Sequence, residues 1–167
     1  MDLRVGKLYC AAMKKIRILF VCHGNICRSP TAEFVMKDLV KKAGVAPRFE
    51  IESAAVSSEE LGNPVYPSAR RTLEKHGISC DGKFARLLTR ADYDNFDVIA
   101  AMDFSNLSNA RRICGGDAQN KIKLLLEFAG RPNCEVEDPW YSGGFESVYA
   151  DILSGCKALF DRFSAGD

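Results

Sequence analysis

The stretch Ile16-Arg17-Ile18-Leu19-Phe20-Val21-Cys22-His23-Gly24-Asn25-Ile26-Cys27-Arg28-Ser29-Pro30 decides the fold of this chain. Residues 16–21 are apolar except for Arg17, which is typical of a central strand in a parallel sheet that is covered on both faces. A helical pattern follows at once, with Ser29 as the expected N-cap and Pro30 as the first helical residue. A buried strand that leads directly into a helix predicts an α/β fold.

The remaining sequence continues this alternation of strands and helices. Further strands are predicted at about residues 49–56, 96–102 and 121–126, and helices at 67–76, from Asp103 or Ser105 to Gly115, and at 145–163. We therefore predict a single doubly wound domain with a four-stranded parallel sheet in the order 2-1-3-4, flanked by helices. Ligands bind at the carboxyl edge of such sheets, where Cys22 is expected to lie.

The length of 167 residues fits one well-buried domain. Residues 1–12 show no convincing hydrophobic period, and we expect them to form a poorly ordered N-terminal extension. The domain itself is then expected to span residues 13–167.

Charge and cysteine content restrict the class of protein. The chain carries 23 Lys and Arg against 22 Asp and Glu, which argues against a broad basic surface for nucleic acid or for a membrane. No apolar run approaches the length of a membrane span, and basic residues interrupt any signal-peptide core. The seven cysteines are scattered without zinc-ligand spacing, so we expect a reduced, cytoplasmic protein without a metal site.

The segment between the first strand and its helix has the residues of an anion-binding loop. Successive backbone N–H groups and a helix N-terminus attract a tetrahedral dianion, and Gly24 and Asn25 tolerate the positive φ that such a loop needs. The same groups, with Arg28, favour the thiolate form of Cys22, which could then attack the bound phosphorus. The predicted phosphate-binding residues are His23, Gly24, Asn25, Ile26, Cys27, Arg28 and Ser29.

Residues Cys22 to Pro30 match the pattern C-x-G-N-x-C-R-S-P without a gap, and this pattern resembles the signature of the low-molecular-weight protein tyrosine phosphatases. The order of apolar runs from Ile16 to about Phe163 is similar to that family. The segment Asp138-Pro139-Trp140-Tyr141 stands where the family carries its acid loop.

The resemblance implies hydrolysis of phosphotyrosine through a phosphocysteine intermediate, without a metal or another cofactor. Cys22 would be the nucleophile, Arg28 would bind two phosphoryl oxygens, and Asp138 would act as general acid and later as base. Asp103 is the first alternative acid. The expected partners are phosphotyrosine-containing proteins, with phosphate, vanadate or arsenate as active-site anions, and we expect a monomer.

Several residues near this site have two interpretations. Trp140 and Tyr141 would wall the substrate pocket by resemblance, although core packing would also explain Trp140. Glu59 stands where the family often has an aromatic wall residue, and Lys83 where it has a histidine, so substrate preference and loop support are expected to differ. The resemblance makes Cys27 a redox partner of Cys22, whereas simple packing under the loop is the alternative.

Other functions share parts of this pattern. A thioredoxin-coupled arsenate reductase of the same fold could use Cys80 as a relay thiol, and a phosphate-binding or phosphotransfer module could carry phosphate on Cys22. Neither has an evident use for the acid Asp138. An inactive phosphotyrosine-binding protein would be expected to lose Cys22, Arg28 or Asp138, and all three are present.

Overall fold

A computed structural model describes residues 14–165, and the predicted extension 1–12 lies outside this range. The described residues contain four strands, namely β1 (Ile16–Cys22), β2 (Phe49–Ala55), β3 (Val98–Ala101) and β4 (Ile122–Leu124). They form one parallel sheet in the order β2-β1-β3-β4. The predicted sheet and its strand order are therefore confirmed.

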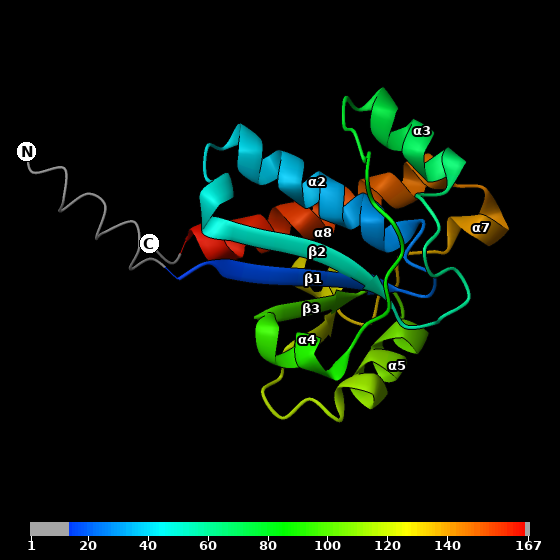
Figure 1. Cartoon of the computed structure of the whole chain (residues 1–167). Helices are drawn as coiled ribbons and strands as arrows, with labels where there is room; N and C mark the ends of the chain where they lie inside the picture. The colour runs from blue at the N-terminus through cyan, green and yellow to red at the C-terminus, as the bar shows by residue number, and fades with distance from the viewer. Residues whose placement is uncertain (1–13, 166–167) are drawn as a thin grey trace, which may run out of the picture.

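Helices cover both faces of the sheet (Figure 1). One face is covered by α2 (Arg28–Lys42), α3 (Pro67–Lys75), α6 (Leu125–Phe128) and α8 (Phe145–Ser164), and the other by α4 (Arg90–Asn95) and α5 (Phe104–Cys114). The short elements η1 (Ala46–Arg48) and α7 (Pro139–Ser142) complete the order. This arrangement is the doubly wound architecture that alternating strands and helices favour.

The central position of β1 in the sheet explains why its residues are apolar at successive positions. Ile18 and Phe20 belong to the core beneath α2 and α8, whereas Leu19 and Val21 belong to the core beneath α4 and α5. All four side chains are fully buried. Because neighbouring strand residues point to opposite faces, a strand covered on both sides needs apolar residues at odd and even positions alike.

The predicted start of α2 is wrong by about two residues. The helix begins at Arg28 with Cys27 as its N-cap, and no side chain caps it. Ser29 is not the N-cap because its hydroxyl oxygen lies 2.9 Å from the Cys22 sulfur and accepts a hydrogen bond from Asn25. The hydroxyl therefore serves the loop before the helix instead of the backbone N–H groups inside it.

The predicted strands at 96–102 and 121–126 are shorter in the structure. The second of them ends at Leu124, and Leu125 and Leu126 begin α6. An apolar run of this length fits a strand or a helical turn equally well, and here both leucines pack into the core that α6 shares with α8.

Helix boundaries elsewhere follow their sequence signals. Thr89 and Asp92 form a capping box at the start of α4, and Asp103 caps α5 by accepting a hydrogen bond from the backbone N–H of Asn106. Gly115 ends α5 in the left-handed conformation. Asp103 lies two residues after the end of β3, so the residue that caps α5 also lies at the carboxyl edge of the sheet.

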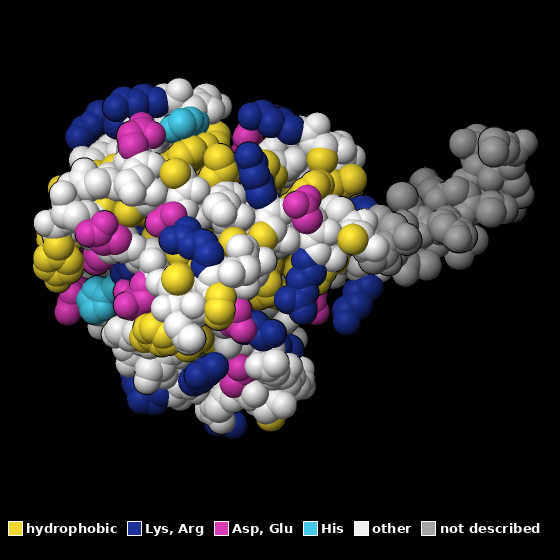
Figure 2. Space-filling view, turned by 180° about the vertical axis from the view of Figure 1, so that it is seen from behind, with side chains coloured by type: hydrophobic (Ala, Val, Ile, Leu, Met, Phe, Trp, Pro, Cys, Tyr) yellow, Lys and Arg dark blue, Asp and Glu magenta, His cyan; other side chains and the backbone are white. Residues whose placement is uncertain are grey.

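The face opposite to that of Figure 1 carries Lys and Arg side chains interspersed with Asp and Glu (Figure 2). Neither sign of charge dominates this face, in agreement with the near balance of charges in the sequence. No helix among residues 14–165 is long and apolar enough to cross a membrane.

Candidate active site

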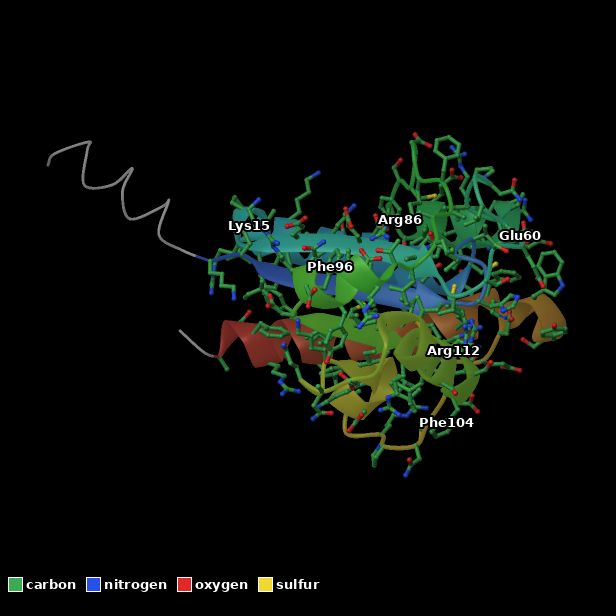
Figure 3. The ribbon with its side chains drawn as sticks, turned by 60° about the horizontal axis from the view of Figure 1, so that its bottom comes forward. Lys15, Glu60, Arg86, Phe96, Phe104 and Arg112 are labelled. Atoms are coloured by element: carbon green, nitrogen blue, oxygen red, sulfur yellow. The ribbon has the colours of Figure 1, made fainter. Side chains whose placement is uncertain are left out.

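A pocket of about 220 Å³ opens at the carboxyl edge of the sheet. Glu60, one of its lining residues, lies at the opposite end of the molecule from Lys15, which precedes β1 (Figure 3). The pocket combines the end of β1, the start of α2, the loop after β2 and the segment around α7. Its lining residues are Cys22, His23, Gly24, Ile26, Cys27, Arg28, Glu59, Glu60, Asp138, Trp140 and Tyr141.

Cys22 is the last residue of β1, and its thiol lies at the floor of the pocket. The backbone N–H of Ser29, in the first turn of α2, donates to its sulfur at 3.4 Å, and the Ser29 hydroxyl lies 2.9 Å from the same atom. A helix N-terminus and a hydroxyl donor both stabilise negative charge at this position. The local geometry therefore suits a sulfur that carries charge.

Arg28 lies beside this sulfur, and its side chain is only 3% exposed. Its Nη1 group donates to the Oδ2 atom of Asp103 at 2.8 Å and to the carbonyl oxygen of Val136 at 3.0 Å. Burial acts to lower the pKa of Arg28, but the charges of Cys22, Asp103 and Asp138 outweigh it and the pKa is raised. A guanidinium anchored in this way presents a fixed cation to an anion in the pocket.

Asp138 enters the site from the segment before α7. Its Oδ1 atom accepts a hydrogen bond from the backbone N–H of Trp140 at 3.0 Å and caps α7, while its Oδ2 atom lies 3.6 Å from Nη2 of Arg28. The backbone N–H of Val136 donates to the carbonyl oxygen of Met102 at 2.8 Å and ties this segment to the end of β3. Asp138 is thus a helix cap and a pocket residue at once.

The loop itself differs from its prediction at Gly24. Asn25 has a φ of 58°, as predicted, whereas Gly24 has no positive φ. A Cβ atom at Gly24 would meet the Cγ atom of Glu60 at 3.1 Å, so the close approach of the Glu60 side chain explains the glycine. Asn25 and Ser29, both predicted to bind phosphate, are buried and lie behind the residues that line the pocket.

One wall of the pocket is aromatic. Trp140 is 57% exposed and Tyr141 is 87% exposed, so the alternative that Trp140 is a core residue is wrong. The ring of Trp140 instead contacts the ring of Tyr66, with 4.9 Å between their centroids. Two exposed aromatic side chains at a pocket mouth offer a surface on which another ring can stack.

Another part of the pocket lining is polar. Glu59 lines the pocket as predicted, and its Oε2 atom lies 3.0 Å from Nε2 of the exposed His23. The neighbouring Glu60 also lines the pocket and accepts a hydrogen bond from Asn63. An aromatic group in this pocket therefore meets both aromatic side chains and carboxylates.

The six cysteines within the described part of the chain are free thiols. Burial raises the pKa of Cys27 to about 12, and the neighbouring Cys22 and Asp138 act in the same direction. Cys80 is buried and does not belong to the residues that line the pocket, and burial raises its pKa. Among residues 14–165 no group of three or more His, Cys, Asp or Glu side chains could hold a metal ion.

The structure adds residues that the sequence did not place in this site. The sequence indicates Asp103 as a helix cap and as an alternative acid, and the structure shows that it also anchors Arg28. Its position two residues after the end of β3 is the available signal, because parallel strands that are neighbours in a sheet end at the same edge. Tyr66 and Glu60 have no such signal, since a long irregular segment brings Glu60 to the pocket and Tyr66 to the ring of Trp140.

Comparison with known proteins agrees with this geometry. Residues 17–166 match the family model described as low molecular weight phosphotyrosine protein phosphatase. The chain is 40% identical over 145 residues to the low molecular weight protein-tyrosine-phosphatase YfkJ of Bacillus subtilis, which covers 86% of this chain and 93% of that protein. It is also 40% identical over 149 residues to the low molecular weight phosphotyrosine protein phosphatase of Gallus gallus, covering 87% and 94% of the two chains.

A solved structure shows the same fold. The crystal structure of YfkJ from Bacillus subtilis superimposes with a TM-score of 0.87 at 38% sequence identity and covers 91% of this chain and 96% of that chain. With the sheet order, the cysteine loop and the family match in agreement, the chain belongs to the low molecular weight phosphotyrosine protein phosphatases.

Proposed function

We propose that this chain hydrolyses phosphotyrosine in proteins, with Cys22 as nucleophile and Asp138 as acid and base. The observation that carries this proposal is the arrangement of three groups in one pocket. The sulfur of Cys22 accepts hydrogen bonds at the start of α2, and Arg28 and Asp138 line the same cavity with their side chains 3.6 Å apart.

In the first step the Cys22 thiolate attacks phosphorus in line with the phenolic oxygen. The S–P bond forms as the P–O bond to the phenol breaks, and protonated Asp138 gives its proton to the leaving oxygen. The Nε and Nη2 groups of Arg28 bind equatorial phosphoryl oxygens, while Nη1 stays bound to Asp103.

In the second step water replaces the thiolate. Asp138, now ionised, takes a proton from the water as its oxygen bonds to phosphorus and the S–P bond breaks. The products are inorganic phosphate and the regenerated Cys22 thiolate. Backbone N–H groups of the loop from His23 to Ser29 stabilise the charge on the phosphoryl group in both steps.

The pocket walls support an aryl phosphate as substrate. Trp140 and Tyr141 offer exposed ring faces for the tyrosyl ring, and Glu59 lines the same pocket. We also propose that the enzyme acts as a monomer, that residues 13–167 form the phosphatase domain, and that phosphate, vanadate and arsenate compete for the anion site.

Hydrolysis of a phosphotyrosyl peptide and of a small aryl phosphate, each with and without a chelator, tests this function. Full activity in chelator, with competitive inhibition by phosphate and vanadate, is the expected result. Loss of activity in chelator would contradict the proposed chemistry. Cys22→Ser is expected to bind these anions without turnover, because a serine hydroxyl does not ionise in the range where a thiol does.

A further inference from the structure

Tyr66 connects three parts of the active site. It is the N-cap residue of α3, and its backbone N–H donates to the carbonyl oxygen of Ile26, in the loop after Cys22, at 2.8 Å. Its ring lies 4.9 Å from the ring of Trp140 in α7, and it stacks on Phe145, the first residue of α8, at 6.0 Å between centroids. The helices α3 and α7 lie at the same end of the molecule (Figure 1). One half-buried side chain therefore joins the cysteine loop, α7 and the last helix.

The position of Tyr66 is fixed by its own neighbours. Pro67 follows it, and a residue before proline is restricted to extended conformations, in agreement with the φ of −56° and ψ of 136° at Tyr66. The hydrogen bond to Ile26 holds the backbone N–H of the same residue. The ring packs, together with Phe145, against the core beneath α2 and α8. Tyr66 is therefore a fixed surface for the ring that lies on it.

Trp140 depends on this surface. Its side chain is 57% exposed, and Tyr66 is its only aromatic partner among residues 14–165. The helix α7 has only four residues and ends at Gly143, which has a left-handed φ of 74°, so its own hydrogen bonds contribute little to its stability. Pro139 is buried and anchors the first residue of α7. The contact between the two rings fixes the second residue.

The backbone of Trp140 in turn orients Asp138. Its N–H donates to Oδ1 of Asp138 at 3.0 Å, so Oδ2 is the oxygen that faces Arg28, at 3.6 Å from Nη2. A shift of Trp140 would move the donor on which this orientation depends. Proton transfer requires the acid to lie within hydrogen-bond reach of the leaving oxygen, so a small shift slows the step that uses the acid.

We propose that Tyr66 is a positioning residue for the acid Asp138. Its ring holds Trp140, and the backbone N–H of Trp140 holds the Asp138 carboxyl group in the pocket. The phenolic oxygen of Tyr66 has no part in this role, since it makes no hydrogen bond to another residue in the range 14–165. The inference rests on the proposed function, but the packing of Trp140 can be measured without turnover.

The first test is the fluorescence of Trp140, which is the only tryptophan in the sequence. In Tyr66→Ala we expect emission at longer wavelength and stronger quenching by acrylamide, because the indole ring loses its cover. Tyr66→Phe keeps the ring and should match the wild type in both. Phe160→Ala is the matched control, because it removes a half-buried ring from the same core, where Phe160 pairs with Phe49 at 6.3 Å. Phe49 begins β2, at the edge of the sheet away from the pocket.

Kinetics separate the acid from the pocket wall, because kcat/KM covers the steps up to release of the phenol. We expect Tyr66→Ala to lower kcat/KM about tenfold for a phosphotyrosyl peptide, the scale on which one aromatic pair shifts an equilibrium. The loss should be less than about twofold for an aryl phosphate whose phenolate leaves without protonation. Tyr66→Phe and Phe160→Ala should match the wild type. A change in the aromatic wall alone would lower both values of kcat/KM alike.

Combination with Asp138→Asn tests the route through the acid. If Tyr66 acts only by placing this proton donor, Tyr66→Ala should cost nothing further for the peptide once the donor is gone, and the two losses are not additive. A full second loss of about tenfold in the double variant would overturn the proposal. Equal losses for the two substrates would do the same, and so would unchanged quenching of Trp140 in folded Tyr66→Ala.

Circular dichroism establishes that each variant is folded. If Tyr66→Ala does not fold, Tyr66→Leu takes its place with the same expected results, because leucine fills the space beside Phe145 without offering a ring. Aryl phosphate hydrolysis by the wild type is measured on the same preparations. Absence of that activity would contradict the proposed function, whereas the fluorescence of the variants would still decide whether Tyr66 holds Trp140.

Discussion

The Nη1 group of Arg28 donates a 2.8 Å hydrogen bond to Oδ2 of Asp103, a residue 75 positions later in the chain. The other oxygen of the same carboxylate accepts the backbone N–H of Asn106 at 2.7 Å and caps α5. The N-terminus of α5 therefore fixes the carboxylate of Asp103, and this carboxylate fixes the guanidinium of Arg28 at the N-terminus of α2.

This relationship predicts the effect of Asp103→Asn. Without the charged acceptor the guanidinium keeps only the Val136 carbonyl oxygen and the longer contact with Asp138 to fix its orientation, and displacement of a binding group by about 1 Å costs on the order of 10²-fold in rate. We expect kcat/KM and vanadate affinity to fall by about that factor, equally for substrates with good and poor leaving groups. Retention of wild-type vanadate affinity would show that Asp103 does not hold Arg28 for anion binding.

Asp138→Asn should behave differently because it removes a proton donor and leaves the anion site in place. We expect kcat/KM for a phosphotyrosyl peptide to fall by roughly 10²- to 10⁴-fold, and vanadate affinity to persist. An aryl phosphate whose phenolate leaves without protonation should lose far less. The measurement is kcat/KM across phenols of graded acidity, and equal losses for all of them would exclude Asp138 as the leaving-group acid.

Oxidation by mild peroxide is expected to inactivate the enzyme reversibly. Peroxide converts the Cys22 thiolate to a sulfenic acid, and attack by the Cys27 sulfur releases water and forms a disulfide. Burial keeps Cys27 a thiol at neutral pH, with its pKa raised to about 12, so Cys22 is the residue that peroxide attacks first.

Cys27→Ser should lose activity in peroxide and recover less on addition of thiol, because no disulfide protects the sulfenic acid from further oxidation. Peptide mapping of the oxidised wild type provides the check. A disulfide between Cys22 and Cys80 would overturn the protective role of Cys27 and would support a reductase-like relay.

Burial acts to raise the pKa of Glu33, but its ion pairs and hydrogen bonds, chiefly with Lys83 and Lys37, outweigh burial and lower the pKa. This lowered pKa predicts how stability depends on pH. A carboxyl group whose pKa is lower in the folded state stabilises the fold above its ordinary value of 4.5, and this contribution is lost as the pH falls through the folded value. Urea unfolding at a series of acidic pH values should show a shallower loss of stability in Glu33→Gln than in the wild type. Parallel curves for the two proteins would contradict this assignment, and Glu50→Gln serves as the control.

The sequence was sufficient to predict the sheet, because buried parallel strands require continuous apolar runs and connect to helices in a fixed hand. The position of Cys22 at the end of β1 followed from that topology. The start of α2 could not be predicted in the same way. A serine before a proline is a good N-cap, and only the tertiary structure shows that Ser29 lies inside the helix with its hydroxyl beside the Cys22 sulfur and does not cap it.

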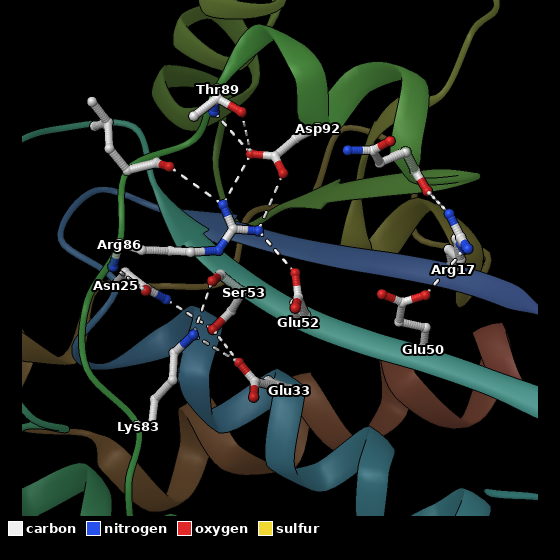
Figure 4. A network of polar contacts seen from close by, with 12 residues as sticks. Arg17, Asn25, Glu33, Glu50, Glu52, Ser53, Lys83, Arg86, Thr89 and Asp92 are labelled. Atoms are coloured by element: carbon white, nitrogen blue, oxygen red, sulfur yellow. Dashed lines mark hydrogen bonds and ion pairs between the residues drawn. The ribbon is translucent and has the colours of Figure 1, made fainter. Parts of the chain in front are cut away.

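The contacts that support the loop from behind could not be predicted from the sequence either. Glu33 lies on α2, Ser53 on β2 and Lys83 in an irregular segment, and nothing in their spacing indicates that they meet. The departure at Lys83 did predict a change in loop support, and the structure shows Lys83 bound to Glu33 and to the Ser53 carbonyl oxygen (Figure 4). Such contacts depend on how the helix packs against the sheet. The hydrophobic pattern of the sequence and the secondary-structure propensities of its residues do not determine that packing.

The central claim is that the phosphoryl group passes through Cys22. Asp138→Asn mixed with an aryl phosphate that has a good leaving group should form the intermediate readily and hydrolyse it slowly, because the same residue activates water. Acid quench followed by peptide mapping should then find one phosphoryl group on the peptide that contains Cys22, and none in the variant that also carries Cys22→Ser. Continued turnover with no phosphoryl group on Cys22 would contradict the account.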